Sequence, residues 1–294
     1  RMTELSTATV SHALNGTRGV SPEARKKVLN AASELGYVRN LAARSLKTGR
    51  SNIIGIIVPD LGNPFFSMIA SSVERTAREF DHSIVICDSE GSGENSISPF
   101  ETLEQFRARG AIWIPQNDED QAPHFSGTTV VLDRPIPGLP SVYSDHRMGG
   151  RLQADHVVRK GYRSIGVIAG PNALFSARER LAGLEEGLES KATISWLVEN
   201  QFIHELNPNV ERHLAEHPVD CIVCGNDVIA IAAGHFLFGT CKKNARLTPV
   251  VGFDDVSLSA LTNPPFTTGR QRFNKLGRVA VETFVVATDR HSEV

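Results

Sequence analysis

"SNIIGIIVPDLGNPFF", residues 51–66, places an almost unbroken apolar run directly before a turn-forming Pro-Asp-Leu-Gly-Asn segment and a second proline. An apolar run without polar alternation is typical of a strand buried on both faces. Six further runs share this character: "HSIVICD", "GAIWIP", "TTVVLDR", "SIGVIAG", "DCIVCGN" and "TPVVGFDD". Amphipathic segments lie between most of them, at 65–80, 98–109, 147–160, 175–189 and 227–239. The alternation predicts parallel sheets covered by helices, divided into two doubly wound α/β halves.

The composition is that of a globular protein with two domains, or with one small module and a larger body. The chain has 294 residues, of which 40% are hydrophobic and 22% charged. It contains no apolar run of eighteen residues, so we expect no transmembrane helix, and no signal-peptide pattern opens it. Four cysteines without a dense framework fit a reducing compartment, and we therefore expect a cytoplasmic protein.

Charge is distributed unevenly along the chain. Residues 1–50 carry nine Lys or Arg and three Glu, a net charge of +6, whereas the remaining 22 basic and 30 acidic residues give −8. A basic head on an acidic body is typical of a nucleic-acid-binding module joined to another domain. A solvated basic helix is the alternative explanation.

The first fifty residues contain three short helical patterns. The first spans about 6–14, with Ser6 as N-cap and Asn15-Gly16 at its end, and its apolar residues share one face: Val10, Ala13 and Leu14. The second spans about 22–35, between Ser21 and Gly36, with Pro22 at its first position. The third, "NLAARSLK" at 40–47, is too short to be stable without DNA or a partner chain.

Three stretches resemble the lactose-repressor (LacI/GalR) family of bacterial transcription regulators: "STATVSHALNG", "VSPEARKKVLNAASELGY" and "NLAARSLKTGRSNIIGIIVPDLGNPFF". The resemblance implies that the first is the recognition helix of a helix-turn-helix in the DNA major groove. It assigns base-edge contacts to Thr7, Ala8 and His12. It assigns phosphate contacts or helix orientation to Thr9, Ser11 and Asn15. The alternative for His12 is an ordinary surface histidine.

The same resemblance makes "NLAARSLK" a hinge helix that enters the minor groove at the centre of the operator. Leu46 would open a base step with Ala43 packed beside it, and Arg44 and Lys47 would face phosphates. Leu46 packed against the body is the alternative. Only "RMTEL" precedes Ser6, where the family has another helix, so we expect a head truncated at its N-terminus and a short C-terminal tail.

The family's body has two subdomains, like a periplasmic sugar-binding protein, with a ligand between them. The implied division is a head at 1–50, one subdomain at 51–145 plus 272–289, and another at 146–271. Ligands of such sheets lie at the carboxyl ends of strands. The expected effector contacts are Phe65, Phe66, Asp145, Ser176, Arg180, Phe202 and Asp227. Aromatic rings, an arginine and carboxylates suit a sugar, a polyol or a nucleobase-like molecule.

Each of these contacts has a structural alternative. Asp227 could cap the helix that follows it, Arg180 could pair with Glu179 or Glu185 on the surface, and Phe66 could belong to the core. His146 stands where the family usually has asparagine, which leaves its role open.

Two other kinds of site have weak support. His213, His217, Cys221 and Cys224 have a zinc-like spacing, but a strand over "DCIVC" would direct the two cysteines to opposite faces. No nucleophile elbow, phosphate loop or paired catalytic carboxylates stand out, so we expect neither an enzyme nor a bound cofactor or metal.

The sequence therefore predicts a homodimeric repressor that binds a double-stranded DNA operator under the control of a small-molecule effector. The first alternative is a metabolite-binding module without DNA binding, and the second is an enzyme with its active site in the cleft.

Overall fold

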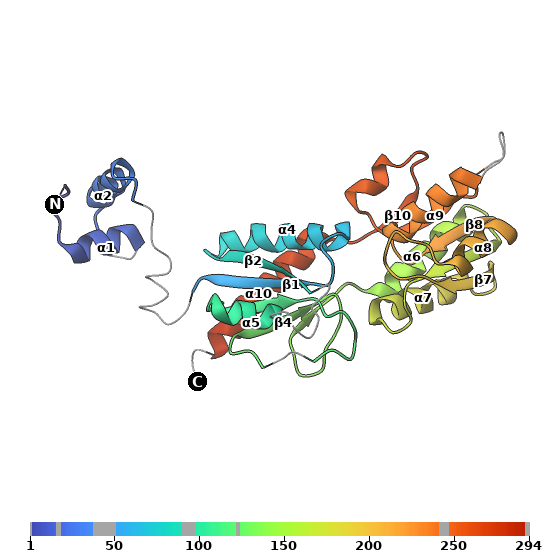
Figure 1. Cartoon of the computed structure of the whole chain (residues 1–294), viewed down its shortest axis with the longest axis horizontal. Coiled ribbons are helices and arrows are strands. Elements are labelled where there is room, and N and C mark those ends of the chain that lie inside the picture. Colours follow the sequence, from blue (N-terminus) through green and yellow to red (C-terminus); the bar gives the residue numbers. More distant parts are fainter. Residues whose placement is uncertain are drawn as a thin grey trace. The chain divides into compact units, whose positions relative to one another are not determined.

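The computed structural model describes residues 2–15, 19–37, 51–89, 98–121, 124–240 and 247–291. The chain divides into two compact units, Arg1–Ser51 and Asn52–Val294 (Figure 1). The hinge helix expected at 40–47, with Ala43, Arg44, Leu46 and Lys47, lies outside the described residues. None of the helices in the described ranges combines the length and the apolar character that a bilayer span requires.

The small unit contains two helices that contact each other, α1 (Thr7–Asn15) and α2 (Pro22–Glu34). Both begin at a serine: Ser6 Oγ accepts the amide of Thr9 at 3.1 Å, and Ser21 Oγ accepts that of Ala24 at 3.2 Å. These bonds satisfy amides that have no partner within the helix. Ala13 and Val28 are buried, so each helix contributes an apolar side chain to the interior of the unit.

The larger unit contains two parallel sheets of identical topology, with orders β2-β1-β3-β4-β5 and β7-β6-β8-β9-β10. In both, the first strand along the chain lies between the second and the third, a common order in doubly wound folds. The first sheet comprises β1 (Ile53–Val58), β2 (Ser83–Asp88), β3 (Gly110–Trp113), β4 (Thr128–Leu132) and β5 (Ser141–Val142). The second comprises β6 (Ser164–Ala169), β7 (Thr193–Glu199), β8 (Cys221–Cys224), β9 (Val250–Asp254) and β10 (Thr267–Arg270).

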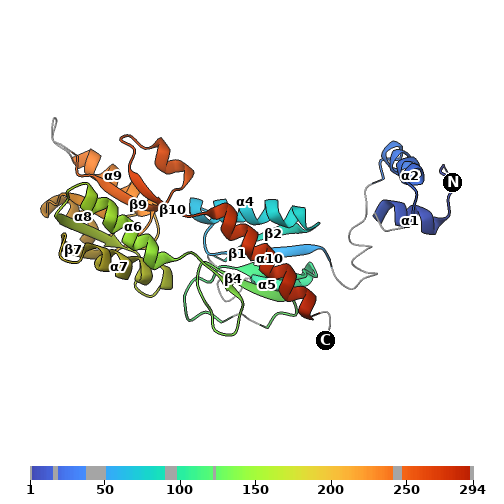
Figure 2. The same ribbon diagram turned by 180° about the vertical axis from the view of Figure 1, so that it is seen from behind.

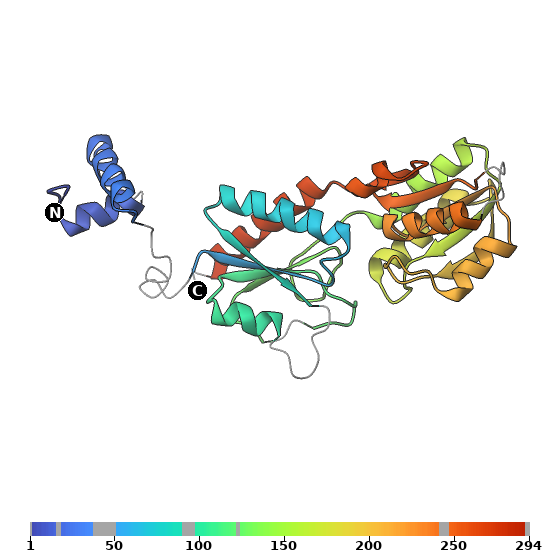
Figure 3. The ribbon, with the colours of Figure 1, turned by 45° about the horizontal axis from the view of Figure 1, so that its top comes forward.

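Helices cover both faces of the first sheet (Figure 3). α4 (Pro64–Glu79) and α10 (Phe273–His291) pack with Ile56 and Ile112 on one face, and α5 (Pro99–Gln105) packs with Ile57 and Trp113 on the other. Ile56 and Ile57 point to opposite faces of the sheet, and both are buried because helices cover both faces. This double coverage explains the unbroken apolar run.

The second sheet has the same layered arrangement. α6 (His146–Arg159) and α7 (Phe175–Leu188) cover one face, and α8 (Pro208–Glu216) and α9 (Asp227–Thr240) cover the other. A short 3-10 helix, Ser257–Leu261, follows β9. The apolar runs and amphipathic segments expected in the body form strands and helices, and "SVYSD" and "ISWLVEN" supply the further strands β5 and β7. α10 and β10 had not been included among the expected elements.

The chain crosses between the sheets at two places in its described part. Residues 143–145 join β5 to α6, and residues 271–272 join β10 to α10. After the second crossing, α10 packs against α4 of the first sheet (Figure 2). These two short segments are therefore the covalent connections between the first and second sheets.

Helices α6 and α7 approach each other closely at two glycines. A Cβ on Gly183 would lie 1.9 Å from the carbonyl oxygen of Arg147, and one on Gly150 would lie 2.0 Å from that of Arg180. Such distances are far below contact distance, so any side chain at either position would push the two helix backbones apart. The glycines thereby set the spacing of the helix that begins at His146 and the helix that carries Arg180.

Gly183→Ala should lower the unfolding free energy of the larger unit by about 1–3 kcal/mol, because the added methyl overpacks a backbone contact. Urea unfolding followed by circular dichroism measures this. The matched control is Gly234→Ala in α9, where a Cβ would meet no atom within 4 Å. The control should leave stability unchanged or raise it by about 0.5–1 kcal/mol. Equal losses in the two variants would contradict the assigned role of the close approach.

Candidate functional site

A cavity of about 180 Å³ lies between the two sheets of the larger unit, at the carboxyl ends of their strands. Residues that follow β1, β3 and β4 line it from the first sheet, and residues that follow β6, β7 and β8 line it from the second. The lining includes Asp60, Asn63, Phe65, Phe66, Gln116, Asp133, Arg134, Ser176, Arg180, Phe202, Asn226 and Asp254. The parallel topology gathers these polar groups, because it places all strand ends of one sheet at one edge.

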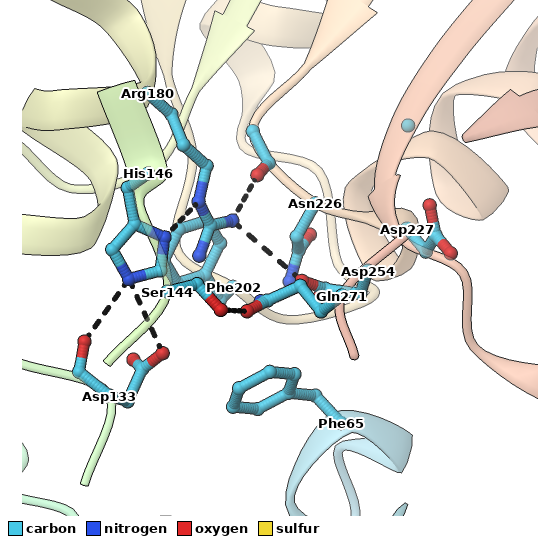
Figure 4. Close-up of polar contacts among 12 residues, drawn as sticks. Phe65, Asp133, Ser144, His146, Arg180, Phe202, Asn226, Asp227, Asp254 and Gln271 are labelled. Carbon is cyan, nitrogen blue, oxygen red and sulfur yellow. Dashed lines mark hydrogen bonds and ion pairs between the residues drawn. The ribbon is translucent and has the colours of Figure 1, made fainter. Parts of the chain in front are cut away.

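Arg180 of α7 is the central cation of the cavity (Figure 4), and it is only 6% exposed. Its Nη1 donates to the carbonyl oxygen of Gly225 at 2.6 Å and lies 3.9 Å from Asp254 Oδ1. Its Nε donates to His146 Nδ1 at 3.4 Å. The guanidinium carbon lies 4.3 Å from the ring centroid of Phe253. These contacts hold a buried charge in one orientation, which excludes the surface ion pair considered for this residue.

Two aspartates occupy equivalent places in the two subdomains. Asp133 follows β4 and Asp254 ends β9, each at the fourth strand along its sheet. Both have a positive φ, +74° and +118°, a conformation that costs a non-glycine residue about 1–3 kcal/mol and that clusters at functional sites. Asp133 Oδ1 is buried and accepts no hydrogen bond from the described residues. This oxygen lies 3.6 Å from Nε2 of His146.

Burial changes the protonation of this site. It raises the pKa of Asp254 to about 7, although Arg180 and a hydrogen bond from Gln271 oppose the change. Burial, followed by the charge of Arg180, lowers the pKa of His146 to about 4. At neutral pH the histidine is uncharged, and Asp254 is divided between its acid and carboxylate forms. Shifts of this size are frequent at binding and catalytic sites.

Aromatic rings supply the apolar part of the lining. Phe65 is 5% exposed and packs edge-on against Phe66, with ring centroids 5.1 Å apart. Phe66 also packs against the core of the first subdomain, so it serves both the core and the cavity. Phe202 lies so close to Gly170 that a Cβ there would be 2.1 Å from its ring. The glycine thus allows Phe202 to turn toward the cavity.

The cavity brings together five of the seven residues expected to contact an effector: Phe65, Phe66, Ser176, Arg180 and Phe202. Asp145 does not line it, and this placement corrects the expectation. Its side chain accepts the amide of Met148 at 2.8 Å and so caps α6. The strand before it, β5, ends at Val142, so Asp145 belongs to the crossing and not to a strand end.

Asp227 also lies outside the cavity, because it is fully buried and bonded to neighbouring segments. Its carboxylate accepts the amide of Val256 at 2.9 Å and the hydroxyl of Thr268 at 2.6 Å. Burial raises its pKa to about 6, against these hydrogen bonds. The preceding residue, Asn226, lines the cavity and accepts the amide of Ile229 at 3.0 Å at the start of α9. Asp227 therefore holds neighbouring segments together, and the helix cap considered for it is made by Asn226.

Asp133, Asp254 and Asn226 were not among the expected contacts. Each stands at the end of a buried run, in "TTVVLDR", "TPVVGFDD" and "DCIVCGN". The rule that ligands lie at the carboxyl ends of strands could have found them. It did not, because the exact ends of the strands and the direction of each last side chain depend on the backbone conformation.

In the small unit, the side chains of Thr7, Ala8, Ser11 and His12 are exposed along α1, and Thr9 is half-buried. Ser6 Oγ also lies 2.8 Å from Thr9 Oγ1, so Thr9 takes part in the start of the helix. Asn15 ends α1. Ala13 is buried, so its side of α1 faces the interior of the unit, whereas the face that carries His12 is exposed.

The cysteines of "DCIVC" belong to two different layers. Cys221 packs with the side chains under α6 and α7, and Cys224 packs with those under α8 and α9. Burial raises the pKa of the Cys221 thiol to about 12. Within the described ranges, no group of three or more His, Cys, Asp or Glu side chains could hold a metal ion.

Comparison with known proteins identifies both units. Residues 51–293 match the family of periplasmic binding proteins and sugar-binding domains of the LacI family, and residues 1–40 match the bacterial regulatory proteins of the lacI family. The ribose operon repressor of Halalkalibacterium halodurans is 32% identical over 289 residues, covering 96% of this chain and 86% of that protein. The HTH-type transcriptional repressor PurR of Haemophilus influenzae (strain PittGG) is 32% identical over 292 residues, covering 96% and 87%.

Solved structures agree with these matches. The lac repressor dimer bound to operator and the anti-inducer ONPF superposes with a TM-score of 0.80 at 27% identity, covering 98% of this chain and 90% of that one. A periplasmic binding protein/LacI transcriptional regulator from Alkaliphilus metalliredigens QYMF, complexed with D-xylulofuranose, has a TM-score of 0.72 at 25% identity, covering 81% and 91%. The chain belongs to the LacI family of bacterial regulatory proteins and is a DNA-binding transcriptional regulator with a periplasmic-binding-protein-like body.

Proposed function

We propose that this regulator is a dimeric repressor whose operator affinity is controlled by a monosaccharide bound in the cavity around Arg180. The observation that carries the proposal is the gathering of two buried arginines, Arg134 and Arg180, two buried aspartates and three phenylalanine rings in a single small cavity. Arginine and carboxylates form paired hydrogen bonds with adjacent hydroxyls, and aromatic rings cover the apolar face of a sugar ring.

The size of the cavity favours a single sugar ring. Its volume of about 180 Å³ is below the ~300–1,000 Å³ typical of sites for drug-sized ligands. The name of the ribose operon repressor favours a pentose, and D-ribose is therefore the first probe. Thermal unfolding with a panel of sugars, polyols and nucleobases tests the class, because a ligand at 100 times its dissociation constant stabilises by about 2.7 kcal/mol.

For DNA, we propose that α1 of each subunit reads base edges in the major groove through Thr7, Ala8 and His12. Thr9, Ser11 and Asn15 would orient the helix or contact phosphates. The histidine can donate to guanine acceptors, whereas the methyl of Ala8 can make only an apolar contact. At the operator centre, Leu46 and Ala43 would act in the minor groove, with Arg44 and Lys47 on the phosphates.

Arg180→Ala should weaken binding of the sugar by about 1.5–3 kcal/mol, because it removes a charged hydrogen-bond donor from a buried site. Isothermal titration with the sugar found in the thermal panel measures the loss. Arg151→Ala is the matched control: Arg151 is an exposed arginine of α6, paired with Glu186, that does not line the cavity. Unchanged affinity in Arg180→Ala would contradict the site.

Affinity for the sugar should increase about tenfold between pH 6 and pH 8. Asp254, with a pKa of about 7, becomes a carboxylate in this range and then accepts from ligand hydroxyls. The unliganded protein should show the opposite trend. Asp254 keeps its proton to a higher pH in the folded protein than in the unfolded chain. The part of the unfolding free energy that comes from Asp254 is therefore lost as pH rises from about 4 to about 7. Asp254→Asn should remove both dependences, and a pH profile that this variant leaves unchanged would assign the titration to another group.

His12→Ala should relax base preference at one symmetric pair of operator positions by about 1–3 kcal/mol per contact. Selection of operators from a random DNA pool, with the full-length protein, measures this. Lys26→Ala, on exposed α2, is the comparison: it should lower affinity for all sequences alike if it contacts phosphate. Identical selected sequences for wild type and His12→Ala would refute base reading by this residue.

A further inference from the structure

His146 occupies the boundary between the two subdomains. It is the first residue of α6, directly after the first crossing, and it is 1% exposed. Its ring centroid lies 6.1 Å from that of Phe175 and 6.5 Å from that of Phe253. The residue does not itself line the cavity. It lies immediately behind two groups that do, Asp133 and Arg180.

The two ring nitrogens of His146 bond to different subdomains (Figure 4). Nε2 lies 3.1 Å from the carbonyl oxygen of Asp133, in the first subdomain, and Nδ1 lies 3.4 Å from Arg180 Nε, in the second. A carbonyl can only accept and a guanidinium can only donate. One form of the ring satisfies both contacts: the neutral tautomer with its proton on Nε2.

The charges around the ring favour the same form. Arg180 and Arg134 face it as cations and Asp133 as an anion, with the Asp133 carboxylate 3.6 Å from Nε2. A protonated ring would lose its acceptor for Arg180 and would add a cation beside a buried guanidinium. The ring is therefore neutral near pH 7.

The bond from His146 also determines which part of Arg180 is offered to the cavity. Nε is used by the histidine and Nη1 by Gly225 and Asp254. Within the described residues, Nη2 makes no hydrogen bond, so it is the nitrogen that can donate to a ligand. A rotation of the guanidinium would exchange these roles, and the acceptor on His146 opposes that rotation.

We propose that His146 is a positioning residue that orients Arg180 toward the effector and fixes it relative to Asp133 across the subdomain boundary. The proposal rests on the proposed function of the cavity. The contact with Arg180 and the contact with Asp133 can be tested separately, because the amide of asparagine can replace Nδ1 and the amide of glutamine can replace Nε2. In His146→Asn the amide can accept from Arg180 but cannot reach Asp133. In His146→Gln the amide nitrogen can reach Asp133, whereas the acceptor near Arg180 is lost.

Isothermal titration with D-ribose and with the best sugar of the thermal panel compares three variants with wild type. We expect His146→Leu and His146→Gln to lose at least tenfold in affinity and His146→Asn to remain within about threefold. Thermal unfolding of each variant establishes that it is folded. A ring that only fills space would produce losses that follow stability, with no rescue by asparagine. Equal losses in the asparagine and glutamine variants, or none in any variant, would overturn the proposal.

Nitrogen-15 NMR of the ligand-free protein provides a readout that needs no sugar. We expect His146 to be protonated at Nε2 and unprotonated at Nδ1 throughout pH 5.5–8, with no titration near its ordinary pKa of about 6.5. A proton on Nδ1, or titration near 6.5, would overturn the proposed arrangement. If no sugar in the panel binds the wild type, the proposed function fails, and the NMR result still decides whether His146 holds Arg180.

Discussion

The parallel direction of the paired strands is the constraint on which the site depends. It brings the carboxyl ends of each sheet to one edge, and both edges contribute to the same cavity. Within the described part of the chain, no strand of one sheet pairs with a strand of the other, and the connections between the sheets are residues 143–145 and 271–272. Contacts between side chains of the two subdomains therefore largely determine the angle between them.

Several contacts between the subdomains contribute to fixing this angle. Asn63 donates to the carbonyl oxygen of Phe202 at 3.3 Å, and Arg178 pairs with Asp118 at 2.8 Å. At the crossings, Ser144 donates to Gln271 at 2.6 Å, and Gln271 donates in turn to Asp254 at 2.9 Å. This last chain of bonds links a cavity carboxylate to both crossing segments. A ligand that engages Asp254 thus acts on groups that also bond to both crossing segments. Such a link would allow a ligand to favour one arrangement of the two subdomains over another.

Much of this architecture was predictable because local patterns determined it. Unbroken apolar runs indicated doubly covered parallel strands, and the serines before α1 and α2 marked both helix starts. The rule that ligands lie at the carboxyl ends of strands selected Arg180 and Phe202, which line the cavity, and Asp145 and Asp227, which do not, and it omitted Asp133 and Asp254. The difference arises from backbone conformation: positive φ values at Asp133 and Asp254 and the helix starts at 146 and 227 decide where each carboxylate points. Sequence spacing contains no information about such reversals. The role of His146 also depends on residues distant in sequence, Asp133 and Arg180, and became visible only in three dimensions.

The central claim is that one protein couples a sugar in the cavity to operator DNA at the head. Thermodynamic linkage makes this coupling reciprocal, so the factor by which the sugar changes operator affinity must equal the factor by which operator changes sugar affinity. The most direct measurement is the dissociation constant of D-ribose for the full-length protein with and without saturating operator DNA. We predict a difference of about 5–150-fold, matched by the change in operator affinity when the sugar is added. Equal sugar affinities in the two conditions would contradict the account.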